Sequence, residues 1–180
     1  MCWRFFIAMN LNDNDFQLFT VPPTFAQDRT VLDARWKELQ REAHPDRFAA
    51  QGAAAQRVAM QWSVRINEAY QRLKDPVRRA AYLCDLNGAP VNAESNTAMP
   101  AEFLMQQMEW RESLDDIDTP EALERLRREV DAGRTRVLSS LDWLIDEKGD
   151  YAAASQQVRA LMFIERFVQD IEVKFDRWGQ

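Results

Sequence analysis

Apolar side chains recur every three or four residues along most of this chain, and this spacing limits the possible folds more than any other feature of the sequence. Such a repeat places apolar side chains on one face of an α-helix, whereas a half-buried strand would alternate every second residue. Glycine and proline, which tight turns between strands use, number only 5 and 7 in 180 residues. The sequence therefore predicts an all-α protein.

Two long amphipathic helices are expected in the first half of the chain. The first follows Asp28, a suitable N-cap, and ends at Ala43 or His44, because Pro45 disfavours the helical conformation in the residue before it. The second runs roughly over residues 56–74, after a loop at 45–53. Ten residues form the two stripes: Leu32, Trp36, Leu39, Ala43, Val58, Trp62, Ile66, Ala69, Tyr70 and Leu73. Two such helices joined by a short loop pack as an antiparallel pair.

Shorter elements flank this pair. One or two helical turns are expected at residues 15–19, before two prolines, and another short helix begins at Pro76 with Asp75 as its N-cap and ends near Leu86. Residues 87–100 have no helical period and are rich in small polar residues, which is typical of a linker. We therefore expect one domain over residues 10–86, a linker over 87–100 and a second domain over 101–180.

Three further helices are expected in the second half. They cover about residues 101–117, then 120–147 after the N-cap Thr119, and then the stretch that follows Asp150 and reaches about residue 178. Each carries one apolar stripe, and the connections between them are short. The sequence therefore predicts a three-helix bundle at the C-terminal end.

Charge and rare residues exclude several classes of function. The formal net charge is −6, and the acidic excess lies in residues 91–180, with 11 basic and 19 acidic side chains against 11 and 10 in residues 10–90. This balance disfavours nucleic acid or an anionic membrane as the main partner. Two cysteines and one histidine cannot make a four-Cys zinc site or a two-His metal site. We expect no metal or cofactor.

The N-terminus gives no targeting signal. The apolar stretch Met1–Met9 is too short for a signal peptide, and no apolar run approaches the 18 residues or so that span a bilayer. We expect translation to begin at Met9 and the protein to be cytoplasmic and monomeric.

The loop between the two long helices carries the tripeptide His44-Pro45-Asp46, and Lys37 and Arg41 share an exposed face of the helix before it. Taken singly, such residues are usually a surface histidine, a helix stop, a turn residue and a solvated face. Together they form a rigid polar corner with no nucleophile beside it, which favours recognition over catalysis.

A basic helix, this tripeptide, R-I-N-E-A-Y-Q-R-L at residues 65–73 and R-R-A-A-Y at 78–82 follow one another in an order that resembles the J domain of DnaJ-type co-chaperones. The resemblance implies that the loop engages the ATPase domain of a DnaK-type chaperone and stimulates its ATP hydrolysis. The chaperone-binding residues that it implies are His44, Pro45, Asp46, Lys37, Arg41 and Arg47.

Three apolar residues of the first C-terminal helix, Leu104, Met105 and Met108, lie off the stripe that contains Trp110. At spacings of three and four they align with acidic residues, and an apolar spot rimmed by carboxylates is typical of a partner-binding patch. Phe163 is similarly off the stripe of the last helix. The alternative is that this helix is buried on two sides, and periodicity alone does not decide between the two.

The segment F-L-M-Q-Q-M-E-W-R-E-S-L-D-D at residues 103–116, after a J domain and a linker, resembles the HscB family, the co-chaperones of iron–sulfur cluster assembly. The similarity runs from about residue 15 to residue 178. It implies that the bundle binds an IscU-type scaffold protein and that the J domain presents this scaffold to the chaperone HscA. The scaffold-binding residues that it implies are Leu104, Met105, Met108, Glu109, Glu112, Asp116 and Phe163.

Two other functions compete with this adaptor. A general J-protein would hold unfolded clients for a DnaK-type chaperone on an exposed apolar surface. An enzyme would need His44 as its base, but the sequence contains no nucleophile motif, glycine-rich phosphate loop or metal cluster to accompany it. We therefore expect a non-enzymatic adaptor.

Overall fold

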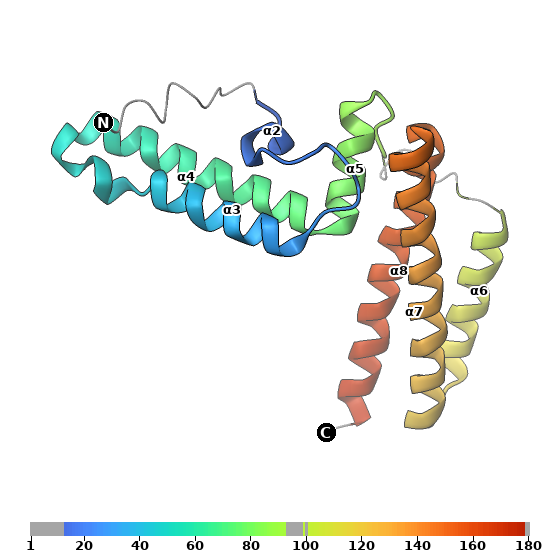
Figure 1. Ribbon diagram of the computed structural model, residues 1–180. Coiled ribbons are helices and arrows are strands. Elements are labelled where there is room, and N and C mark those ends of the chain that lie inside the picture. Colours follow the sequence, from blue (N-terminus) through green and yellow to red (C-terminus); the bar gives the residue numbers. More distant parts are fainter. Residues whose placement is uncertain (1–12, 93–98, 100, 179–180) are drawn as a thin grey trace. The chain divides into compact units, whose positions relative to one another are not determined.

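The computed structural model describes residues 13–92, 99 and 101–178, and every regular element in this part of the chain is a helix (Figure 1). The predicted all-α fold is confirmed there. No helix among these residues has the length and apolar character needed to cross a membrane. The expected start at Met9 lies outside the described residues, and so does most of the second half of the predicted linker.

The described residues fall into two compact units, divided between Arg79 and Ala80. This division lies inside the helix α5, Pro76–Leu86. The domain limits expected from the sequence, with a linker over residues 87–100, stay a prediction.

The N-terminal unit is built on α3, Arg29–Glu42, and α4, Ala53–Lys74, which lie side by side (Figure 1). The predicted N-cap is confirmed, because the Asp28 carboxylate accepts a hydrogen bond from the Thr30 amide at 2.8 Å. The buried row of α4 follows the expected helical spacing, and its members are Ala59, Trp62, Ile66, Ala69, Tyr70 and Leu73.

Two details of this unit differ from the sequence expectation. The predicted loop is mostly a 3₁₀ helix, η1, Pro45–Gln51, whose Phe48 is buried and fastens the segment to the core. Val58 was expected in the core but is 43% exposed. The buried row of α4 begins one position later, at Ala59, which stands three residues before Trp62 and takes the core-facing position in the first turns.

The short helix α2, Asp15–Phe19, is attached to α4 by a buried ion-pair cluster. Asp15 is fully buried, and its two carboxylate oxygens lie 2.5 Å from the guanidinium groups of Arg65 and Arg72. Removing one partner of a buried ion pair leaves an uncompensated charge and is strongly destabilising. Two arginines of the R-I-N-E-A-Y-Q-R-L segment therefore act inside the fold.

The C-terminal unit contains α6, Ala101–Asp116, α7, Pro120–Asp142, and α8, Tyr151–Trp178. The predicted N-caps are confirmed: the Thr119 hydroxyl accepts from the Ala122 amide at 3.3 Å, and the Asp150 carboxylate accepts from the Ala153 amide at 3.0 Å. The second helix, expected to reach residue 147, is α-helical to Asp142 and continues as a π-helix, η2, Trp143–Lys148.

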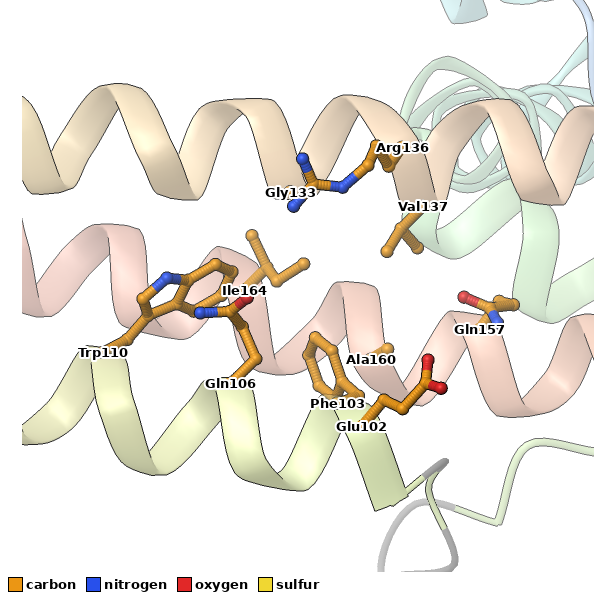
Figure 2. Close-up of a pocket in the computed structure, with 10 residues that line it drawn as sticks. All are labelled: Glu102, Phe103, Gln106, Trp110, Gly133, Arg136, Val137, Gln157, Ala160 and Ile164. Atoms are coloured by element: carbon orange, nitrogen blue, oxygen red, sulfur yellow. The ribbon is translucent and has the colours of Figure 1, made fainter.

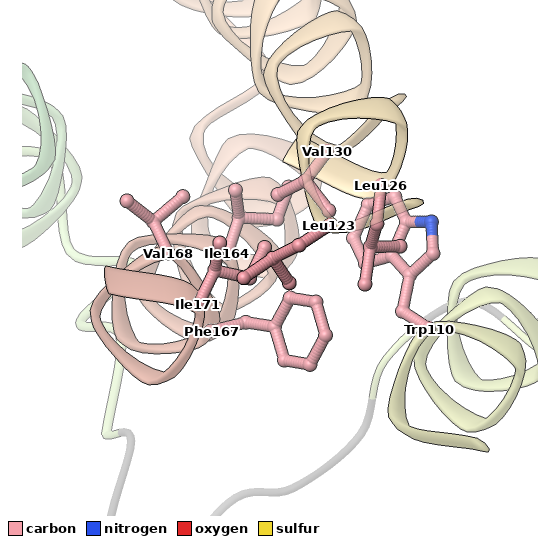
Figure 3. Packing of buried hydrophobic residues seen from close by; sticks show 8 residues of the cluster. All are labelled: Trp110, Leu123, Leu126, Val130, Ile164, Phe167, Val168 and Ile171. Atoms are coloured by element: carbon pink, nitrogen blue, oxygen red, sulfur yellow. The ribbon is translucent and has the colours of Figure 1, made fainter. Parts of the chain in front are cut away.

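The core of this unit forms where all three helices meet (Figure 3). Trp110 of α6 is 2% exposed and packs against apolar side chains of α7 and α8, while its indole N–H donates to Glu129 at 2.8 Å. The other members of the cluster are Leu123, Leu126 and Val130 of α7, and Ile164, Phe167, Val168 and Ile171 of α8. The predicted three-helix bundle is therefore confirmed.

Candidate functional site

The tripeptide predicted to bind a chaperone forms an exposed corner directly after α3. His44 caps η1: its Nδ1 atom accepts a hydrogen bond from the Asp46 amide at 3.3 Å, and Pro45 occupies the first helical position. The side chains of His44 and Asp46 are 58% and 89% exposed. An exposed imidazole thus stands beside an exposed carboxylate.

The predicted basic residues accompany this corner. Lys37 and Arg41 are exposed one turn apart on α3, and Arg47 is exposed on η1. The Arg47 guanidinium donates to the Arg41 carbonyl at 3.3 Å, at the C-terminal end of α3, where the helix dipole favours a positive charge. The corner thus combines a positive surface with one protruding negative charge.

The corner offers charges and hydrogen-bonding groups. Within residues 13–92, 99 and 101–178, no group of three or more His, Cys, Asp or Glu side chains is arranged to hold a metal ion. Cys84, the cysteine in this part of the chain, is buried, and its burial raises the pKa of the thiol to about 11, so that it stays protonated and weakly nucleophilic at neutral pH.

The patch on α6 is exposed as well. Leu104, Met105 and Met108 are 41%, 64% and 63% exposed, whereas Trp110 on the same helix is 2% exposed. The side chains of Glu109, Glu112 and Asp116 are also exposed. Within the described residues of the C-terminal unit, the other helices of the bundle therefore leave these side chains exposed.

Helical spacing divides the outer face of α6 into two rows. Leu104, Met108, Arg111 and Asp115 follow one another at spacings of four, three and four, and Met105, Glu109, Glu112 and Asp116 form the parallel acidic row. Arg111 of the first row reaches α8, because its guanidinium lies over the Phe163 ring at 5.3 Å.

Phe163 of α8 belongs to the core edge and to the surface at the same time. Its ring meets Phe103 edge-on at 5.9 Å and stacks on Phe167 at 6.0 Å, while the side chain stays half-buried. Arg111, which covers it, was not among the predicted binding residues. Its spacing of three from Met108 was a signal in the sequence, but its partner Phe163 is far along the chain and only the fold brings them together.

A cavity of about 230 Å³ opens on the other side of α6 (Figure 2). Its apolar wall includes Phe103 and Val137, and Glu102, Gln106 and Arg136 stand at its polar side. Gly133 of α7 also lines the cavity. A Cβ atom at this position would lie 2.8 Å from the Trp110 ring, so the close approach of α6 and α7 needs glycine there. This cavity lies apart from the Leu104 row and contains none of the predicted site residues.

Comparison with known proteins gives consistent matches over nearly the whole chain. The family model described as the HSCB C-terminal oligomerisation domain matches residues 99–172. A curated relative from Bordetella pertussis, named co-chaperone protein HscB homolog, is 49% identical over 160 residues, which are 88% of this chain and 94% of the relative. A relative of the same name from Burkholderia multivorans is 46% identical over 172 residues, 94% of this chain and 98% of the relative.

Solved structures agree with these matches. Chaperone HscB from Vibrio cholerae has 35% sequence identity and a TM-score of 0.79, with 92% of this chain and 99% of that chain covered. Human co-chaperone protein HscB has a TM-score of 0.86 at 23% identity, with 92% and 84% covered, and at this identity the likeness shows the fold alone.

Proposed function

This chain belongs to the HscB family of co-chaperones, and on that premise we propose that it is a cytoplasmic, non-enzymatic adaptor with two binding surfaces. Its J domain engages an HscA chaperone, of the DnaK type, and stimulates the ATPase of that chaperone. Its bundle holds an IscU-type scaffold protein during the maturation of iron–sulfur proteins. The observation that carries the proposal is that the described residues expose two chemically different surfaces, one on each compact unit.

The corner supports the chaperone half of the proposal. Lys37, Arg41 and Arg47 provide a positive surface for an acidic partner, and the 89% exposed Asp46 carboxylate is available to an arginine of that partner. Each of these contacts is a charge or a hydrogen bond, and none makes or breaks a covalent bond. The ATP hydrolysis therefore belongs to the chaperone, and the corner contributes recognition.

The α6 patch supports the scaffold half. Leu104 and Met108 provide exposed apolar area, and Arg111 of the same row lies over the Phe163 ring. The exposed carboxylates of Glu109, Glu112 and Asp116 run along the neighbouring row. Apolar anchors surrounded by polar residues are the usual anatomy of a specific protein interface. A scaffold with an apolar spot and basic neighbours would match this surface.

The decisive experiment measures the ATPase rate of a purified HscA-type chaperone with this protein and an IscU-type scaffold, added separately and together. We expect moderate stimulation by this protein alone and a larger rate with both, because the scaffold is delivered to the chaperone in the complex. No stimulation under either condition contradicts the chaperone half, and equal rates with and without scaffold contradict delivery.

The exposed apolar row also fits the second candidate, a general J-protein that holds unfolded clients. Pulldown from a lysate distinguishes the two functions. One discrete scaffold protein, retained at high salt and lost on Leu104→Ala, supports the adaptor. Many denatured proteins bound without preference support the general J-protein.

A further inference from the structure

Polar side chains of α4 hold both ends of α3. Tyr70 bonds to Arg29 and Asp33 near the start of the helix, and further contacts hold three residues towards its end, each of which directly precedes a residue proposed to bind the chaperone. These three residues are Trp36, Gln40 and Ala43. Their successors in the sequence are Lys37, Arg41 and His44. One set of residues thus faces α4 while the next set faces outward.

The contacts with the end of α3 come from two residues of α4, one turn apart. The Asn67 side-chain oxygen accepts hydrogen bonds from the Trp36 indole N–H and from the side-chain amide of Gln40, both at 2.8 Å. The same side-chain amide of Gln40 also donates to the Ser63 backbone carbonyl at 3.0 Å. The Ser63 hydroxyl donates to the Ala43 carbonyl at 3.0 Å, one residue before the corner.

At the end of α3, these contacts restrict the sliding and rotation of α3 against α4, which the apolar core restricts less. Leu32 and Leu39 are buried between the helices, but apolar burial has little directional preference, so it resists separation of the helices more than sliding or rotation. Hydrogen bonds weaken steeply when their angle or distance changes. Asn67 itself is exposed, so its replacement opens no cavity in the core.

We propose that Ser63 and Asn67 are positioning residues for chaperone stimulation: they hold α3 and the start of the corner so that Lys37, Arg41 and His44 reach the partner together. The inference rests on the proposed function of the corner. Without these contacts, Lys37 and Arg41 still attract the chaperone. The tripeptide that begins at His44 is then displaced from the position in which it stimulates the ATPase.

The test compares Asn67→Leu with Asn67→Asp. Leucine removes the accepting oxygen at similar size, whereas aspartate keeps it. In ATPase titrations of a purified HscA-type chaperone with full-length protein, we expect Asn67→Leu to lower the maximal stimulated rate by about fivefold, with the half-saturating concentration changed by less than about twofold. Asn67→Asp should restore the rate. The control Gln71→Leu makes the same kind of exchange at another exposed position of α4.

The single histidine of the chain gives a second readout. The imidazole C–H signals in a proton NMR spectrum belong to His44, and we expect them to shift in Asn67→Leu and to stay unchanged in Gln71→Leu. Circular dichroism checks that the variants are folded. If Asn67→Leu fails to fold, Ser63→Ala removes only the bond to Ala43 and should show the same loss in a milder form.

Three results overturn the inference: wild-type stimulation by folded Asn67→Leu, an equal loss in Gln71→Leu, or a loss in Asn67→Asp as large as in Asn67→Leu. If the wild-type protein itself gives no stimulation, the proposed function of the corner is wrong, and that outcome is visible before any variant is compared.

Discussion

The two exposed surfaces of this protein are built in opposite ways. The corner after α3 consists of charged and polar groups held by a proline, a cap and hydrogen bonds, and the buried Phe48 fastens the following turn to the core. The α6 patch combines apolar side chains with a row of carboxylates on an uninterrupted helix, and another face of this helix contributes Trp110 to the core of the bundle. The corner depends on the placement of a few groups, whereas the patch depends on apolar area.

This difference has consequences for mutation. We expect a polar corner to lose its function when one group changes. The stability of the fold should change little, because exposed loop residues contribute little to it. An apolar patch loses affinity in steps, as each side chain removes part of the contact area. The following variants test whether the two surfaces are as independent as this comparison implies.

The largest effect is expected for His44→Gln. Stimulation of the chaperone ATPase should fall to the basal rate, because glutamine lacks the imidazole ring whose Nδ1 accepts from the Asp46 amide. Melting temperature and scaffold affinity should match those of the wild type. Full stimulation by the folded variant means that the corner is not the chaperone site.

Trp110→Ala should reduce the stability of the bundle by about 3–5 kcal/mol, since it removes the largest buried side chain of the cluster and leaves a cavity. Trp143→Ala is the matched control, because Trp143 is 52% exposed and should cost much less. Urea unfolding followed by circular dichroism measures both variants. If Trp110→Ala lowers chaperone stimulation as much as it lowers scaffold binding, the two surfaces are not independent.

The double variant Leu104→Ala, Met108→Ala should weaken scaffold binding by about 2–3 kcal/mol, as truncation of central interface residues does. Calorimetry with a purified IscU-type scaffold measures the change. The control is Met60→Ala in α4, because Met60 is as exposed as Met108, at 61% against 63%. Unchanged affinity in the double variant shows that the scaffold binds elsewhere.

The smallest effect is a pH dependence inside the N-terminal unit. The Tyr70 hydroxyl donates to Asp33 at 2.6 Å, and this bond, supported by Arg29, lowers the pKa of the Asp33 carboxyl. A carboxyl whose pKa is lower in the folded state stabilises the fold above its unfolded pKa, and the stabilisation is lost as the pH falls through the folded value.

The difference in melting temperature between wild type and Asp33→Asn should therefore shrink between pH 6 and pH 3, which thermal unfolding at several pH values measures. A constant difference across this range means that the charge of Asp33 contributes nothing to the fold.

Local signals in the sequence were sufficient for much of the fold. Asp28, Thr119 and Asp150 were recognised as helix starts because capping depends on residues within three positions. Pro45 marked the end of α3 because proline restricts the backbone locally, but the binding role of the corner came from the resemblance to J domains. The 3₁₀ form of η1 and the π-helical η2 were missed, because neither has a distinctive residue spacing.

The site residues divide in the same way. The two rows of α6 follow from the spacing of three and four residues in the sequence, but this spacing alone does not show whether a second element covers them. Arg111 was missed because its contact, Phe163, stands in another helix. In the sequence, Asn67 is only a member of the segment that resembles J domains. Its hydrogen bonds with Trp36 and Gln40 become apparent only in the fold, where α3 and α4 lie side by side.

By itself, the sequence determined the helices, their caps and the polar corner, since each depends on interactions within about one turn of the chain. The tertiary structure decided which face of α6 is buried around Trp110, how Asp15 meets Arg65 and Arg72, and which residues of α4 hold α3. These contacts join residues far apart in the chain, and no periodic pattern encodes which distant partner a side chain will meet when the helices pack.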